Sequence, residues 1–267
     1  MTETRIYTAS LILIGNELLS GRTQDKNLTF IAKGLNEIGI SMLAAYVIPD
    51  VRETIINLLN EVRTKYDYVF TTGGIGPTHD DITTECVAAA FGVGTYVDEE
   101  TAELLTKRIQ ARGEIMNPAR LRMATFPQGS ELLKNEVSAA PGYKLENVFV
   151  MAGVPRIMQL MFREAKKHLR GGQIIKSRGA VTDIGEGTIA APLAELQKRY
   201  PMIDIGSYPQ MRQNVGFRVS IVLRGTNEHI LNRAHEELMG FLHDLGGNPI
   251  EEDPQTTQGS AEPEDLK

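Results

Sequence analysis

A glycine-rich segment with two adjacent aspartates constrains this chain more than any other feature. It runs Thr71-Thr72-Gly73-Gly74-Ile75-Gly76-Pro77-Thr78-His79-Asp80-Asp81-Ile82-Thr83. The apolar run Tyr68-Val69-Phe70 before it predicts a buried strand, and the alanine-rich stretch 85–91 after it predicts a helix. A glycine turn between a strand and a helix can direct backbone N–H groups toward an anion. The segment therefore predicts a phosphate or oxyanion site.

The aspartate pair, Asp80 and Asp81, sets this loop apart from an ordinary anion site. Two carboxylates beside a phosphate would repel it unless a divalent cation lay between them. We therefore expect both residues to bind a divalent metal (Mg²⁺, Mn²⁺ or Co²⁺) and to be catalytic. One of them could instead cap the following helix, but a cap needs a single residue and leaves the other unexplained.

The surrounding pattern alternates apolar strands with amphipathic helices. We expect strands at 7–14, 40–48, 68–72 and 148–151, and helices at 28–38, 51–65, 83–91, 98–111 and 156–169. Such alternation predicts an α/β fold, a three-layer, doubly wound and mostly parallel sheet. The stretch 117–147 is rich in Pro, Gly and Asn, and we expect loops with short pieces of structure there.

The order of predicted strands and helices changes at Gly171-Gly172. Beyond it the order is strand (174–181), helix (185–200), two strands (203–208 and 216–223) and helix (229–245), which predicts a small α+β domain with an antiparallel sheet. The predicted organisation is a ligand-binding α/β domain at 1–170, the α+β domain at 171–250 and a disordered acidic tail at 251–267.

Composition excludes several classes of protein. The net charge is −6, but residues 251–267 hold six acids and one lysine, so the rest is close to neutral and lacks the charge for a nucleic-acid face. No apolar run approaches the length of a membrane span, and no apolar core follows the first residues as in a secretory leader. The one cysteine, Cys86, lies in a predicted helix and fits a core position. We expect a cytoplasmic protein with a small-molecule ligand, and neither nucleic acid nor membrane as partner.

The topology predicts where the ligand lies. In an open parallel sheet it binds beyond the carboxyl ends of the strands. Four loops meet there, and they contain Gly15-Asn16-Glu17, Asp50, the glycine segment and Gly153-Val154-Pro155. Neither a Gly-x-x-x-x-Gly-Lys-Ser/Thr loop nor a Gly-x-Gly-x-x-Gly turn after the first strand is present, so the common nucleotide folds are disfavoured.

Several of these polar residues have two interpretations. Asp50 can assist a metal or water, or it can cap the helix at 51. Asp25 and Asn27 can contact ligand, or they can cap the helix that follows them. Glu17 is expected to contact ligand hydroxyls or a metal-bound water. His79 is expected to be an exposed loop side chain.

These motifs resemble those of a known family. The glycine segment resembles the signature of the molybdopterin-binding fold shared by MogA, MoaB and gephyrin. The aspartate pair and the motif Gly15-Asn16-Glu17-Leu18-Leu19-Ser20-Gly21 are similar to the CinA branch (competence/damage-inducible protein A). The same domain opens eukaryotic FAD synthases. Ala140-Pro141-Gly142-Tyr143 and Ala152-Gly153-Val154-Pro155 resemble later motifs of that branch, and the resemblance covers residues 5–245.

The resemblance implies metal-dependent hydrolysis of the pyrophosphate in ADP-ribose, FAD or a similar dinucleotide, by a homo-oligomer. It implies that Asp81 is the aspartate shared with the molybdopterin enzymes, that Asp80 is the additional one, and that Asp50 acts beside them. Molybdopterin is the other ligand it implies. Whether the ligand is a dinucleotide or molybdopterin, the residues expected to bind it are Gly15, Asn16, Glu17, Asp25, Asn27, Thr72, Gly73, Gly74, Gly76, Pro77, Thr78, Gly142, Gly153 and Pro155.

Two other functions fit the same motifs. The first alternative is a molybdopterin or nucleotide binding module without turnover, linked to molybdenum cofactor biosynthesis. The second is adenylation of molybdopterin, as in MogA, against which the aspartate pair and the second domain argue.

The sequence departs from the branch's pattern at three places. Lys26 stands in place of a threonine, Ala152 in place of a proline, and Arg156-Ile157 in place of a Ser-Glu pair. Arginine at 156 could recruit an extra phosphate. Full CinA proteins carry a further amidase domain acting on nicotinamide mononucleotide, and since no room for one follows residue 245, we expect that activity to be absent.

Overall fold

The computed structural model describes residues 5–135, 137–212 and 216–253. The chain divides into two compact units, residues 1–173 and 174–267, which are described separately below. The division falls a few residues beyond the boundary predicted at Gly171.

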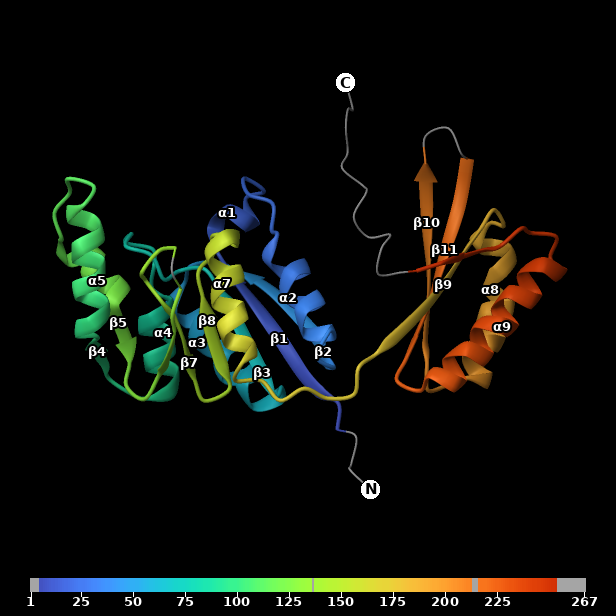
Figure 1. The fold of residues 1–267 in the computed structure, drawn as a ribbon, viewed down its shortest axis with the longest axis horizontal. Helices are drawn as coiled ribbons and strands as arrows, with labels where there is room; N and C mark the ends of the chain where they lie inside the picture. Colours follow the sequence, from blue (N-terminus) through green and yellow to red (C-terminus); the bar gives the residue numbers. More distant parts are fainter. Residues whose placement is uncertain (1–4, 136, 213–215, 254–267) are drawn as a thin grey trace. The chain divides into compact units, whose positions relative to one another are not determined.

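A six-stranded sheet forms the centre of the first unit (Figure 1). Its order is β2-β1-β3-β8-β7-β6. The first four strands are parallel, whereas β7 and β6 are antiparallel to their neighbours. The bounds are β1 (Tyr7–Ile14), β2 (Ile40–Ile48), β3 (Tyr68–Thr72), β6 (Glu131–Leu133), β7 (Gly142–Leu145) and β8 (Val148–Met151).

Helices cover both faces of this sheet, which confirms the predicted three-layer, mostly parallel α/β fold. One face carries α2 (Asn27–Asn36) and α7 (Pro155–Lys166), and the other carries α3 (Arg52–Lys65) and α4 (Thr83–Phe91). Alternate residues of β1 explain the two layers, because the side chains of a strand point to opposite faces. Leu11 and Leu13 enter the α2/α7 core, whereas Ile12 and Ile14 enter the α3/α4 core.

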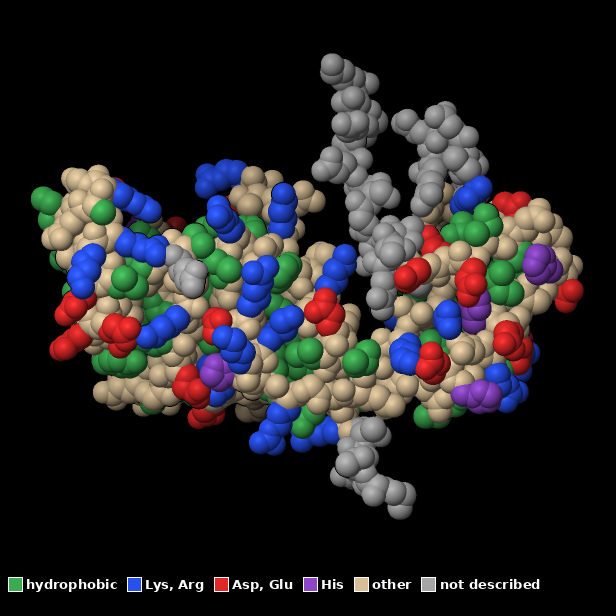
Figure 2. All heavy atoms as spheres, viewed as in Figure 1, with side chains coloured by type: hydrophobic (Ala, Val, Ile, Leu, Met, Phe, Trp, Pro, Cys, Tyr) green, Lys and Arg blue, Asp and Glu red, His purple; other side chains and the backbone are tan. Residues whose placement is uncertain are grey.

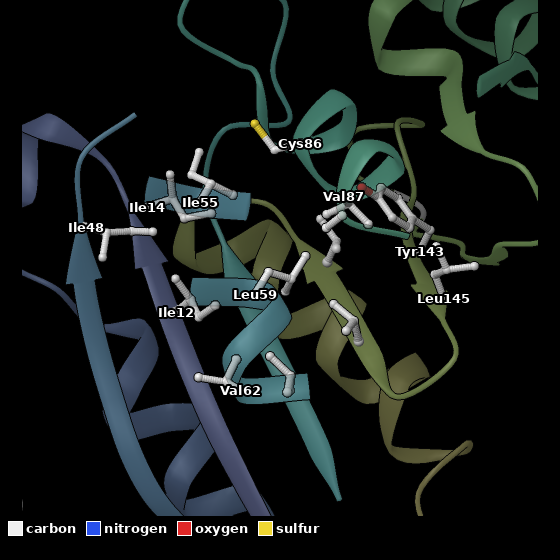
Figure 3. Close-up of a cluster of buried hydrophobic side chains, with 14 of the residues drawn as sticks. Ile12, Ile14, Ile48, Ile55, Leu59, Val62, Cys86, Val87, Tyr143 and Leu145 are labelled. Carbon is white, nitrogen blue, oxygen red and sulfur yellow. The ribbon is translucent and has the colours of Figure 1, made fainter. Parts of the chain in front are cut away.

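Figure 3 shows the α3/α4 core, in which side chains from β1, β2 and α3 converge. Cys86 of α4 is fully buried in this cluster, as predicted for a core position. Burial raises the pKa of its thiol to about 11, so the thiol is protonated and unreactive at neutral pH. The core fixes the strand ends from which the ligand loops emerge.

The stretch 117–147 contains more regular structure than its composition predicts. A two-stranded sheet pairs β4 (Thr95–Val97) with β5 (Thr125–Pro127). β6 and β7 extend the main sheet by antiparallel pairing with each other and with β8. Strands this short are stabilised by the neighbouring strand rather than by their own sequence, so the sequence did not predict them. The other elements of the unit are α1 (Asn16–Leu19), α5 (Glu99–Gln110), α6 (Pro118–Leu121) and the 3₁₀ turn η1 (Arg122–Ala124).

The second unit is an antiparallel sheet with two helices, as predicted. The strand order is β10-β11-β9-β12. Its core includes Ile189 and Leu196 of α8 and Leu231, Leu238 and Leu242 of α9. The elements are β9 (Lys176–Thr182), α8 (Glu186–Arg199), β10 (Asp204–Arg212), β11 (Gly216–Gly225), α9 (Glu228–Asp244) and β12 (Ile250–Glu252).

Strand β12 corrects the prediction that a disordered tail begins at 251. Glu251 and Glu252 pair with Ala180 and Gly179 of β9, so backbone pairing at the sheet edge outweighs their acidic character. The remaining predicted tail, residues 254–267, lies outside the described residues. None of the helices in the described ranges combines the length and apolar character that crossing a membrane requires.

Candidate functional site

The loop between β3 and α4 owes its path to two glycines. Gly73 has φ 102°, and a Cβ there would lie 2.1 Å from the carbonyl oxygen of Ile14. Gly74 has φ 68°, and a Cβ there would lie 2.1 Å from Oγ1 of Thr83. Only glycine satisfies both the positive φ and this close approach. The glycines therefore place the loop directly against the end of β1.

Thr83, at the start of α4, closes the loop from the other side. Its buried hydroxyl donates to the carbonyl of Gly73 at 3.0 Å, and its N–H donates to the carbonyl of Gly74 at 3.0 Å. Sequence reasoning missed this role, although a threonine at the first helical position is the signal that could have revealed it.

The loop offers free donors, but not all those that we predicted. The N–H of Gly73 donates to the carbonyl of Met151 at 3.1 Å, so the prediction that it binds phosphate is wrong. The N–H groups of Gly74, Ile75 and Gly76 donate to no oxygen of the described residues. Three consecutive free donors can form a concave anion site.

Asp81 holds the loop together. Its Oδ2 accepts hydrogen bonds from the N–H of Thr78 at 2.8 Å and from the hydroxyl of the same residue. The carboxylate also lies over Gly76, where a Cβ would be 2.6 Å from Oδ2. It does not cap α4, whose first turn receives no side-chain hydrogen bond. Oδ1 remains available to a ligand.

Arg122 secures the same loop from η1. Its guanidinium donates to the carbonyl of Asp81 at 2.7 Å and to that of Thr78 at 3.2 Å, and it lies 3.5 Å from the carboxylate of Glu85. Sequence patterns could not predict this contact, because Arg122 is 41 residues from Asp81 in a stretch with no periodic pattern.

Asp80 is the exposed member of the aspartate pair. Among the described residues, its carboxylate has one ion-pair partner, the side chain of His79, which is 4.0 Å away and itself almost fully exposed. The Thr78 hydroxyl first, and then its own backbone N–H and His79, hold the pKa of Asp80 below its usual value. Asp80 is therefore ionised at neutral pH and free to bind a cation.

Asp50, which follows the end of β2, interacts electrostatically with Asp80. Its Oδ2 accepts the N–H of Asn16 at 2.9 Å, so it holds α1 and does not cap α3, whose first turn has no side-chain cap. Burial first, and then the charges of Glu17 and Asp80, raise the pKa of Asp50, against the lowering effect of the Asn16 N–H. The structure thus brings three acidic side chains from three loops within electrostatic reach.

These acids fit one kind of metal site better than another. No group of three or more His, Cys, Asp or Glu side chains within the described ranges is arranged to hold a metal ion. A closed protein cage, as for structural zinc, therefore does not fit. Mg²⁺ commonly uses one or two carboxylates together with waters and substrate phosphates. Asp80 and the free oxygen of Asp81 fit that donor set.

The fourth loop, between β8 and α7, lies against the others. A Cβ built on Gly153 would be 3.4 Å from Cα of Gly73. The side-chain amide of Asn27 donates to the carbonyl of Gly153 at 2.9 Å, which ties α2 to this loop. Asp25 accepts the N–H groups of Asn27 and Leu28, so its capping interpretation is confirmed. The four predicted loops therefore meet at one edge of the sheet.

Two predicted ligand contacts have a structural explanation instead. Gly142 is buried in β7, where a Cβ would lie 2.4 Å from the carbonyl of Val150, so strand packing requires this glycine. Thr72 is buried at the end of β3. Pro77 is exposed on the glycine loop, and Pro155 begins α7 behind Gly153, at a first helical position that suits proline.

Comparison with known proteins agrees with this geometry. A family model described as a probable molybdopterin binding domain matches residues 10–171, and the chain is 33% identical over 266 residues to a CinA-like protein of Chloroherpeton thalassium. The chain belongs to the CinA-like, molybdopterin-binding domain family. That alignment covers 91% of this chain and 62% of the Chloroherpeton protein.

Other relatives of this CinA-like chain cover its two units. A protein of Pyrobaculum calidifontis is 34% identical over 217 residues, covering 76% of this chain and 81% of that protein. A crystal structure of CinA from Thermoplasma acidophilum, described as of unknown function, matches with a TM-score of 0.56 at 31% identity, covering 61% of this chain and 97% of that one. Residues 176–246 match the middle domain of FAD synthase, which coincides with the second unit.

Proposed function

We propose that this CinA-like chain is a divalent-metal-dependent pyrophosphatase acting on ADP-ribose, FAD or a similar dinucleotide. One observation carries the proposal. A loop with three free N–H donors lies beside the acidic side chains Glu17, Asp50 and Asp80, and burial and then the charges of Glu17 and Asp80 raise the pKa of Asp50. Donors for phosphate next to a concentration of negative charge are best explained by a ligand that brings both phosphates and a cation.

The residues of the glycine loop and Arg122 have three roles under this proposal. Gly74, Ile75 and Gly76 donate N–H groups to pyrophosphate oxygens. Asp80 and Asp81 would hold the cation, which when bound would supply positive charge to the phosphates and to the attacking water. Arg122 is a positioning residue, because it fixes the backbone of Asp81.

Asp50 suits the role of general base. Its raised pKa makes it a better proton acceptor than an ordinary aspartate, and the Asn16 N–H fixes its orientation. It would take a proton from the attacking water at the oxygen that Asn16 leaves free. Glu17, whose carboxylate lies over Gly15, is placed to meet ligand hydroxyls.

A second function, a binding module without turnover linked to molybdenum cofactor biosynthesis, is favoured by a different observation. The family match itself describes molybdopterin binding, and the free donors at Gly74–Gly76 would serve a pterin phosphate equally well. The three acids argue for the enzyme, since a lone phosphate monoester binds better without them. The FAD synthase-like second unit is also compatible with a nucleotide-processing enzyme.

The test is a substrate panel. ADP-ribose, FAD, NAD and ATP are incubated with the full chain and Mg²⁺, Mn²⁺ or Co²⁺, and AMP is followed by chromatography. We expect AMP from at least one dinucleotide, with its loss on chelation and in Asp80→Asn. No product with any metal would reject the pyrophosphatase and favour the binding module, with molybdopterin as the next ligand.

Self-association and a cytoplasmic location complete the proposal. The edge strand β2, with the sequence Ile-Ser-Met-Leu-Ala-Ala-Tyr-Val-Ile, has no charge or proline to protect it, and it leaves Leu43 62% and Val47 45% exposed. A homo-oligomer that covers β2 would bury them. Light scattering behind size exclusion should show a multimer that Val47→Lys dissociates, and a monomeric parent would reject it.

A further inference from the structure

Two basic side chains beside the site have no use in the proposed hydrolysis. Lys26 immediately precedes α2, and Arg156 lies in the first turn of α7. Both are exposed, and neither has a hydrogen-bond or ion-pair partner in the described part of the chain. Their charges are therefore available to something outside the protein.

The fold brings these two residues to the same place. The Asn27 amide donates to the carbonyl of Gly153 at 2.9 Å, so the residue after Lys26 is bonded to the loop that leads into Arg156. α2 and α7 also pack against each other. The rings of Phe30 and Phe162 meet edge to face, with their centroids 6.0 Å apart. Figure 1 shows the two helices side by side, and Figure 2 shows that the visible face of the unit, including this end, carries exposed Lys and Arg side chains.

The acid next to Lys26 in the sequence forms no ion pair with either cation in the described part of the chain. Asp25, next to Lys26, uses its two oxygens to accept the N–H groups of Asn27 and Leu28, at 3.1 and 2.9 Å. The charges of Glu17 and Asp80 act on Asp50. Neither Lys26 nor Arg156 therefore forms an ion pair with these acids in the part of the chain that the structure describes.

Asn27 supplies an independent sign of a ligand at this point. Its side chain is only 4% exposed, and its Oδ1 has no hydrogen-bond partner. A buried acceptor without a donor is costly, and native structures complete such groups with water or ligand. Since the other end of the same amide holds Gly153, the missing donor, a water or a ligand hydroxyl, belongs beside the loop between β8 and α7.

We propose that Lys26 and Arg156 bind a phosphate ester that the substrate carries in addition to its pyrophosphate, so that the preferred dinucleotide is phosphorylated on a ribose hydroxyl. The inference rests on the proposed function. The acids with their cation, and the donors of Gly74–Gly76, already provide for the pyrophosphate. A lysine and an arginine together match the two negative charges of a phosphate monoester.

The experiment measures binding to the full chain by calorimetry for two matched pairs of ligands: ADP-ribose 2′-phosphate against ADP-ribose, and coenzyme A against its dephospho form. We expect the extra phosphate to tighten binding about tenfold or more in at least one pair. We expect Lys26→Thr/Arg156→Ser to remove that preference while leaving the affinity for the unphosphorylated partner unchanged. The control Lys33→Thr/Arg112→Ser, at two exposed cations elsewhere in the unit whose side chains have no partner among the described residues, should keep it.

Two results would overturn the proposal. One is equal affinity within both pairs for the parent protein, a result that needs no variant to fold. The other is an equal loss of affinity for phosphorylated and unphosphorylated ligands in the double variant. That result would assign the two cations to the pyrophosphate. Binding is read without turnover, so a preference in a protein that releases no AMP would reject hydrolysis and retain this inference.

Discussion

One acidic residue of the site, Asp50, is unfavourable to the protein that holds it. Asp50 is partly buried and lies in the field of Glu17 and Asp80, and the raised pKa of its carboxyl records that burial and repulsion. Asp67, elsewhere in the unit, shows the opposite case. Burial alone would raise the pKa of Asp67, but hydrogen bonds from Thr8 and the guanidinium of Arg5 lower it. A carboxylate kept where it costs stability is characteristic of a functional site.

Asp50→Asn should therefore separate stability from activity. Because folding raises the pKa of Asp50, the ionised form destabilises the folded state above that pKa, and the penalty disappears below the ordinary value of about 3.9. We expect the variant to gain up to about 1 kcal/mol in the free energy of unfolding at pH 7, with the gain vanishing near pH 4. AMP release should fall by about 100-fold or more.

The matched control is Asp67→Asn, which removes a carboxylate whose pKa is lowered. It should lose stability at pH 7 and keep AMP release, as urea unfolding and the chromatographic assay would show. If Asp50→Asn instead lost stability like Asp67→Asn, the acids would not form an electrostatically loaded site.

At the scale of elements, the β3–α4 loop is held by backbone geometry and by one distant arginine. The glycine segment predicted a turn between a strand and a helix, and the structure confirms it. What it could not predict is which N–H groups are free, because the donor of Gly73 is taken by Met151, from a strand about 80 residues later. The capping interpretations of Asp50 and Asp81 failed for the same reason, since their partners, Asn16 and Thr78, are set by tertiary packing and loop geometry.

Gly73→Ala tests the close approach of this loop to β1. A Cβ 2.1 Å from the Ile14 carbonyl, at φ 102°, should cost about 3 kcal/mol or more in the free energy of unfolding. Gly92→Ala is the control, because Gly92 has φ 65° but no atom within 4 Å of its Cβ position, and should cost about 1 kcal/mol. Equal losses in urea unfolding would mean that the loop does not lie against Ile14.

Arg122→Met tests whether the guanidinium of Arg122, in η1, holds the β3–α4 loop in place. Without donors for the carbonyls of Asp81 and Thr78, amide hydrogens of residues 78–82 should exchange faster with solvent. Since the core is untouched, the free energy of unfolding should change by less than about 1.5 kcal/mol. Unchanged exchange in that segment would show that Arg122 does not hold the loop.

At the scale of the whole molecule, every residue of the proposed site belongs to the first unit. That unit has its own hydrophobic cores on both faces of its sheet and a smaller cluster around Leu105, and the FAD synthase-like unit has a separate core. The sequence predicted both units because hydrophobic periodicity is local. It missed β12 because an acidic segment pairs with β9 only through the fold.

Residues 1–173 alone should therefore fold and release AMP at a rate within about threefold of the full chain, with the same dependence on metal. Circular dichroism would establish the fold, and chromatography the rate. A folded but inactive first unit would show that the second unit contributes to the site.

The most direct measurement of the central claim is Mn²⁺ binding, followed by electron paramagnetic resonance, with and without the α,β-methylene analogue of ADP-ribose. If Asp80 and Asp81 share a cation with pyrophosphate held by Gly74–Gly76, the analogue should tighten Mn²⁺ binding about tenfold or more, and Asp80→Asn should abolish that gain. Mn²⁺ affinity that is the same with and without the analogue in the parent protein would contradict the account.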